Sequence, residues 1–227
     1  MNGETKKKSV GSVLYDDVMG GLRPMIPFVA GGGILMAISF MFGMRIGDNS
    51  VNQFAKILYE IGHNNAMLLM IPIFAGFIAH TIAGQDALAP GMIGGMIAKT
   101  TGSGFLGGIV AGFLAGAVVN GLKKLFKGLP KSLDGLTPVL LYPLISIFVV
   151  GMIIVVALNP IMSEVNVIIT NFLNHLGGAN RILLGLVLGM MMAADLGGPI
   201  NKAAYAFSLA MLEAGNYQIM GAVMTSG

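Results

Sequence analysis

The most informative shortages in this chain of 227 residues are those of cysteine, tryptophan and charge. It has no Cys, so disulfides, a thiolate nucleophile and cysteine metal sites are excluded. Only 10% of its residues are charged, whereas a soluble domain has about 25%, and its mean hydropathy is +0.82. Such a chain cannot cover its surface with polar side chains. We therefore predict an integral membrane protein that lies in a lipid bilayer.

What the chain has in abundance is glycine, with 34 residues, together with long apolar stretches. Small residues let transmembrane helices approach closely, so this composition favours an all-α polytopic fold. We expect a bundle of about six to eight transmembrane helices. Residues 1–21 are predicted to form a cytoplasmic polar lead-in, and residues 22–227 the transmembrane domain. Apolar stretches are expected at about 23–42, 66–82, 88–98, 104–122, 136–158, 182–194, 203–211 and 218–225, and residues 45–65 as a mixed-charge loop.

Charge distribution predicts the topology. Lysines cluster at residues 6–8 and again between Lys123 and Lys131, next to apolar stretches. Because cytoplasmic loops are rich in Lys and Arg, both clusters are expected inside the cell, with the N-terminus cytoplasmic. This requires the short stretch 88–98 to cross the membrane. The clusters are better explained as topology signals than as a nucleic-acid surface.

A ladder of small residues occupies the stretch 104–122. Gly104, Gly108, Gly112 and Gly116 recur every four residues, and Asn120 continues the series. The glycines predict a helix-packing face. For Asn120, a packing role and a functional role both remain open. Residues 161–176 instead alternate apolar and polar residues in a helical pattern, which predicts an amphipathic helix along the membrane interface.

The candidate site is a predicted break in a helix around Asp195–Lys202, where an apolar run meets a charge and then two glycines and a proline. Irregular backbone at membrane depth is tolerated only where it is packed in protein or lines a wet cavity, and a charge there indicates function. Asp195, Asn201 and Lys202 could bond a polar ligand, and Gly197 and Gly198 would allow its close approach. The alternative is that Asp195 and Lys202 neutralise each other while Asn201 caps the resumed helix.

His80 is a secondary candidate. A lone His near a helix end is more often an interfacial or packing residue, although an imidazole also suits a contact with phosphate. The three histidines lack a second ligand at metal spacing, so no metal site, cofactor or catalytic residue is predicted.

Several strings in a fixed order resemble the fructose-type IIC membrane component, the permease, of the bacterial phosphoenolpyruvate-dependent sugar phosphotransferase system. The strings are DLGGPINKAAYAF at 195–207, MIPFVAGGGIL at 25–35, LAPGMIGGMIA at 88–98, GFLGGIVAGFLAG at 104–116 and LYPLIS at 141–146. The chain departs from the family pattern at His80, where a Tyr is expected, and at 83–90.

The resemblance implies a multi-pass protein of the bacterial inner membrane that binds and translocates a sugar, with fructose the first expectation. A separate cytoplasmic B component, served by an A component, would donate the phosphoryl group from a phosphocysteine. Such proteins work as homodimers. Members continue into a Gly-Ile-Thr-Glu string whose glutamate holds the sugar, and this chain lacks it, so we expect a fragment or half of a split permease. The alternatives are a gradient-driven transporter or channel, and a membrane subunit that does not transport.

Overall fold

The computed structural model describes residues 9–44, 51–128, 135–161, 164, 167–168, 171, 178–194, 204–205, 207–211 and 217–226. Throughout these ranges the regular structure is helical and no strand occurs. The main elements in chain order are α1 (Val10–Met41), α2 (Gln53–Tyr59), η1 (Glu60–Met67), α3 (Met70–Ala83), η2 (Gln85–Ala87), α4 (Leu88–Thr100), α5 (Gly104–Leu125), η3 (Phe126–Gly128), η5 (Thr137–Leu141), α6 (Tyr142–Ile153), η6 (Ile154–Leu158), α8 (Gly178–Ala194) and α10 (Tyr217–Ser226). The prediction of an all-α fold is confirmed.

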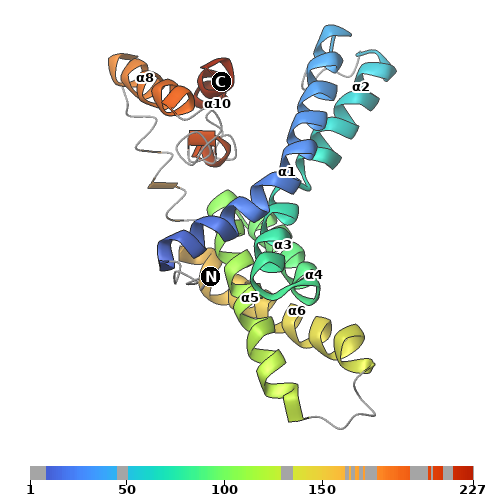
Figure 1. Ribbon diagram of the computed structural model, residues 1–227. Coiled ribbons are helices and arrows are strands. Elements are labelled where there is room, and N and C mark those ends of the chain that lie inside the picture. The colour runs from blue at the N-terminus through green and yellow to red at the C-terminus, as the bar shows by residue number, and fades with distance from the viewer. Residues whose placement is uncertain are drawn as a thin grey trace, which may run out of the picture.

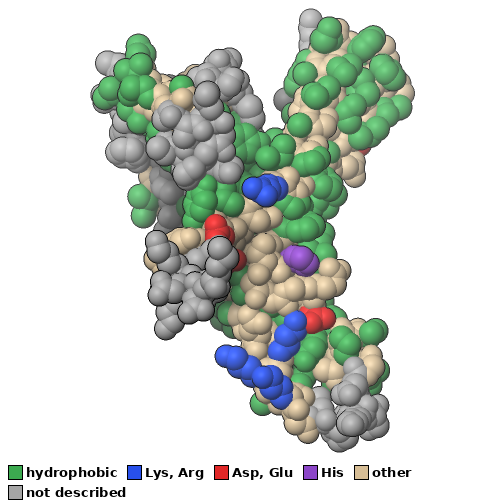
Figure 2. Space-filling view, in the orientation of Figure 1, with side chains coloured by type: hydrophobic (Ala, Val, Ile, Leu, Met, Phe, Trp, Pro, Cys, Tyr) green, Lys and Arg blue, Asp and Glu red, His purple; other side chains and the backbone are tan. Residues whose placement is uncertain are grey.

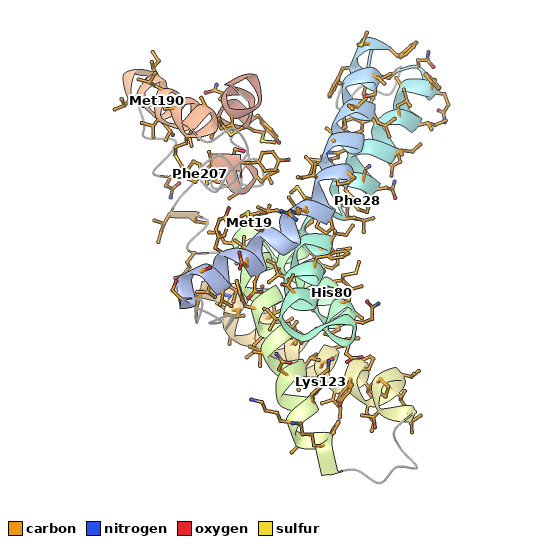
Figure 3. All side chains as sticks on the ribbon, viewed as in Figure 1. Met19, Phe28, His80, Lys123, Met190 and Phe207 are labelled. Carbon is orange, nitrogen blue, oxygen red and sulfur yellow. The ribbon has the colours of Figure 1, made fainter. Side chains whose placement is uncertain are left out.

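The first helix is longer than predicted and it bends. Ser9 caps α1, its hydroxyl accepting a hydrogen bond from the Ser12 amide at 3.3 Å, and the helix then runs for 32 residues. Pro24 and Pro27 lie inside it. A proline cannot donate the usual helical hydrogen bond and its ring crowds the preceding turn. Figure 1 shows the bend, which falls between the labelled residues Met19 and Phe28 of Figure 3.

The second apolar helix also extends beyond its predicted start. Residues 53–83 form a 31-residue helical stretch made of α2, the π-helical η1, the two turn residues Leu68 and Leu69, and α3. The prediction of a loop over 45–65 is therefore wrong for residues 53–65. Ala55 and Gly62 are buried against α1, which supplies the packing that stabilises a helix with so many polar residues. Together α2, η1 and the second half of α1 form a hairpin, here called the arm, that projects from the bundle (Figure 1).

The bundle is built on α3, α4 and α5, which pack through glycines. A Cβ on Gly91 of α4 would lie 2.7 Å from the Ala79 Cβ and 2.9 Å from the Ala75 carbonyl oxygen. On α5, Gly108, Gly112 and Gly116 meet Ile71, Ala75 with Ile78, and Ile82 of α3 in turn. The predicted packing face is confirmed for these three positions. Gly104 differs, because it begins the helix with a φ of +59°.

The order of these contacts fixes the directions of the three helices. Residues of α4 meet α3 in reverse order and residues of α5 meet it in the same order, so α4 is antiparallel to α3 and α5 is parallel to it. The C-terminal ends of α3 and α5 therefore lie at one end of the bundle. The first half of α1 reaches the same end, since a Cβ on Gly20 would meet Thr81. The predicted crossing of the membrane by residues 88–98 requires this arrangement.

Four described helical stretches are long and apolar enough to cross a membrane: Gly11–Met41, Gln53–Ala83, Gly104–Gly128 and Thr137–Ile161. Ile182–Ala193 is a shorter apolar helix. The total of six to eight crossings stays a prediction, and most of the predicted amphipathic segment 161–176 lies outside the described residues. The last elements join the same core, because Leu209 and Met220 are buried in one cluster with Leu22, Met25 and Phe74.

Candidate functional site

Most of the string that carries the strongest sequence signal, residues 195–203 of 195–207, falls outside the described residues. Asp195, Gly197, Gly198, Asn201 and Lys202 all lie in the stretch 195–203, so their roles stay predictions. Its flanks are described. Met192 near the end of α8 and Ala204 just after the stretch are buried in one cluster with Leu188 and Val223. The described residues on the two sides of the stretch therefore belong to the same buried cluster.

His80 lies in the last turn of α3 (Figure 3). It is partly buried, and its ring lies 5.9 Å from that of Phe77 at an angle of 52°. The structure therefore places His80 at the end of the bundle where α3 and α5 finish. Its contact with Phe77 supports the packing role expected of a lone histidine.

Two side chains of α5 complete the C-terminus of α3 at this end. The Asn120 Nδ2 donates to the carbonyl oxygen of Ile82 at 3.1 Å, and the Lys123 Nζ donates to that of Ala83 at 2.6 Å. The last carbonyls of a helix lack partners within it, and a cation there also complements the helix dipole. Of the two roles left open for Asn120, the structure supports the structural one.

Lys123 also forms an ion pair with Asp86 of η2, at 2.7 Å. Between α3 and η2, Gly84 adopts a φ of +76°, which a residue with a Cβ adopts only with strain, and its amide bonds the His80 carbonyl at 2.8 Å. The turn from His80 to Asp86 is thus held to α5 by Lys123 together with Asn120. Lys124 and Lys127 extend the positive charge on exposed surface, and Figure 2 shows the basic side chains gathered at this end. This basic surface, Lys123, Lys124 and Lys127, is called the lysine end below.

The polar residues of η1 were missed by sequence reasoning, because they were assigned to a loop. Glu60 accepts from Asn64 Nδ2 at 2.5 Å, and Asn65 Nδ2 donates to the Glu60 carbonyl at 2.8 Å. The rings of Tyr59 and His63 stack at 5.0 Å. A signal for the helix was present, since Leu58, Gly62 and Ala66 recur every four residues through the polar stretch.

The backbone of η1 packs directly on α1. A Cβ on Gly62 would lie 2.6 Å from the Gly32 carbonyl oxygen, and a Cβ on Gly32 would lie 2.9 Å from the Gly62 carbonyl oxygen. Beside this contact is a shallow pocket of about 250 Å³, whose lining is Pro27, Phe28, Gly31, Gly32, Leu35 and Ala66. An apolar lining of this kind suits a hydrocarbon chain rather than a sugar, which needs convergent polar groups.

In the described part of the chain, no three His, Asp or Glu side chains gather at a spacing that could hold a metal ion.

Comparison with known proteins identifies relatives over nearly the whole chain. The family model described as "Phosphotransferase system, EIIC" matches residues 19–227. The chain is 48% identical over 231 residues to the "PTS system fructose-specific EIIABC component" of Bacillus subtilis (strain 168), covering 99% of this chain and 36% of that protein. It is 49% identical over 181 residues to the "Fructose permease IIC component" of Bacillus amyloliquefaciens, covering 79% and 59%.

A third relative is the "PTS system fructose-specific EIIB'BC component" of Escherichia coli (strain K12), 43% identical over 224 residues, covering 99% of this chain and 39% of that protein. The chain thus spans between about a third and three fifths of the length of these relatives. No solved structure matches it.

Proposed function

This chain belongs to the EIIC family of the phosphotransferase system, and from that membership we propose that it is a sugar-translocating membrane component with fructose as its sugar. The choice of fructose rests on three relatives that are named for this sugar and are identical to the chain at 43% to 49% of the aligned residues. The single observation that carries the proposal is the family match over residues 19–227.

The site proposed for the sugar is the stretch Asp195–Lys202, with His80 as a secondary candidate. A sugar is held by several converging hydrogen bonds, which carboxylate, amide and ammonium groups at a broken helix provide. Two glycines in that stretch would let backbone amides reach the ligand. The neighbouring positions of Met192 and Ala204 support a stretch that turns back on itself.

The partners follow from the chemistry. The chain has no Cys. The phosphocysteine that the family resemblance implies would therefore lie on a B component, outside this sequence, and that component would receive its phosphoryl group from an A component. We place the lysine end in the cytoplasm, because basic residues favour that side of the membrane. The first half of α1 reaches the same end of the bundle, so we place it and the N-terminus in the cytoplasm as well. The protein would act as a homodimer in the bacterial inner membrane.

Transport into membrane vesicles tests the function. Vesicles containing this chain, with the A and B components supplied, should accumulate fructose phosphate only when phosphoenolpyruvate is added. Uptake of unmodified fructose that an ionophore abolishes would instead identify a gradient-driven transporter. No uptake in either condition would identify a subunit that does not transport.

The proposed site is tested in the same vesicles with Asp195→Asn. Losing a charged hydrogen-bond partner should raise the KM for fructose roughly tenfold or more. The matched control is Asp16→Asn, at an exposed aspartate on α1, which should leave the KM unchanged. Normal uptake by a normally inserted Asp195→Asn protein would refute the role of Asp195.

A further inference from the structure

We propose that Tyr59, Glu60, His63 and Asn64 form a second sugar-binding site, at the end of the membrane domain opposite the lysine end. It would receive the sugar on the entry side, before the sugar reaches the stretch Asp195–Lys202. This inference rests on the proposed function, and its ligand class is a monosaccharide.

The depth of these residues supports an entry-side position. Ala66–Ala83 is an apolar stretch whose eighteen residues rise roughly 27 Å, close to the thickness of the hydrocarbon core. The lysine end lies at the Ala83 side of this stretch, through Lys123 and its bond to the Ala83 carbonyl. Glu60 and Asn64 therefore lie just beyond the opposite side, at the level of the other membrane surface.

The chemistry of the four side chains matches a sugar. The stacked rings of Tyr59 and His63 offer a flat surface with polar edges, and Glu60 with Asn64 offers a carboxylate and an amide. Sugars have apolar faces of C–H groups and a rim of hydroxyls, so they suit a ring beside hydrogen-bonding groups. Such a combination is notable in a chain with three histidines and only 7% aromatic residues.

The helix geometry puts the two pairs on one continuous surface. Tyr59 and His63 are four residues apart, as are Glu60 and Asn64, and each pair is shifted from the other by one residue, or roughly a quarter of a helical turn. Gly62 faces α1 and is buried, whereas Glu60, His63 and Asn64 are exposed. The four side chains therefore cover the side and the outer face of the helix, where a ligand has access.

The helical segment that carries these four side chains is tightly packed. The Gly32–Gly62 contact leaves no space for even a methyl group between α1 and η1. Phe40 of α1 backs the Tyr59 ring edge-on at 6.0 Å, and the Asn65 side chain holds the Glu60 carbonyl. The segment is π-helical, a conformation that recurs at functional sites. A preorganised set of polar groups on a packed helix is what a binding site requires.

Direct binding is measurable because the natural chain has no Trp, so one introduced Trp is the only indole fluorophore. In the full chain purified in detergent, Y59W should show a saturable change in emission on titration with D-fructose. The double variant Y59W/E60Q should bind roughly tenfold more weakly, as expected for loss of a charge-assisted hydrogen bond. The matched control is F54W, on the same arm, where Phe54 packs edge-on against Phe42 at 5.2 Å; it should not respond.

Transport supplies the second readout. E60Q and N64A should raise the KM for fructose uptake roughly tenfold and leave the maximal rate within twofold, because the site acts before phosphorylation. Q53A, at an exposed position on the same arm, is the control and should change neither quantity. A silent Y59W, an equal response in F54W, or an unchanged KM in both E60Q and N64A overturns the proposal.

The two proposals fail in different ways. If the natural chain shows no phosphoenolpyruvate-dependent uptake, the proposed function fails, and the fluorescence titration still decides the second site. If uptake is normal in the natural chain and in E60Q and N64A, the second site alone is refuted.

Discussion

Replacing Lys123 by methionine should destabilise the bundle far more than the same change at the neighbouring, exposed Lys124. The side chain keeps a similar length but loses its charge and all its donors. Two contacts disappear: the bond to the Ala83 carbonyl at 2.6 Å and the ion pair with Asp86 at 2.7 Å. They join α5 to the end of α3 and to η2.

The magnitude follows from the burial of each partner. Ala83 is only 7% exposed, so its carbonyl oxygen is left with little access to water, and losing a charged donor costs about 1.5–3 kcal/mol. The Lys123 and Asp86 side chains are 34% and 26% exposed, so solvent screening limits the ion pair to about 1 kcal/mol or less. The sum is about 1.5–4 kcal/mol. For a domain of this size it corresponds to a fall in the melting temperature of roughly 3–16 °C.

The assay is thermal unfolding of the purified chain in detergent, followed by loss of monodisperse protein on size exclusion. Asp86→Asn removes only the ion pair and should lower the melting temperature by no more than roughly 4 °C. Lys124→Met, at the exposed neighbouring lysine, should leave it unchanged. Equal melting temperatures for Lys123→Met and Lys124→Met would refute the conclusion that Lys123 holds the end of α3.

Two further changes test the packing of the bundle. Gly112→Ala should destabilise the protein by about 1–3 kcal/mol, because its Cβ would lie 2.8 Å from the Ala75 carbonyl oxygen. The control is Gly33→Ala, whose Cβ would have nothing within 4 Å. Equal melting temperatures for the two variants would contradict the packed face. Ser103→Ala removes the hydroxyl that donates to Asn159 Oδ1 at 2.5 Å and so links the start of α5 to the helical residues that follow η6. Because both residues are buried, the change should cost about 1–3 kcal/mol in the same unfolding assay. A change below 0.5 kcal/mol would show that the hydroxyl is dispensable.

Local pattern was sufficient to predict much of the fold. The four-residue spacing of Gly108, Gly112 and Gly116 predicts their shared face because a helix is periodic, and the family resemblance of residues 195–207 is confirmed by the match over 19–227. The extent of the second helix was not predictable in this way. Its polar residues are stabilised as helix by α1, through the Gly32–Gly62 contact, and that partner lies thirty residues earlier in the sequence.

The candidate site divides similarly. Residue chemistry singles out Asp195–Lys202, and this stays a prediction. His80 was identified from its type and its place near a helix end, and the structure adds the contact of its ring with Phe77 of the same helix. Asn120 and Lys123 meet the end of α3 only because α4 reverses the chain between them. Glu60 and His63 escaped notice because polarity was taken as evidence for a loop.

The bend of α1 makes this helix a lever. Its first half is fixed to the bundle by the close contacts of Gly20 and Gly21 with α3, and its second half forms the arm together with α2 and η1. From Pro27 to Met41 the helix rises roughly 22 Å, so a change of about 10° at the bend displaces the far end by about 4 Å. Such a displacement is comparable to the size of a sugar ring. With two prolines at the bend, a small rotation at the core would thus shift the surface formed by Tyr59 and Glu60.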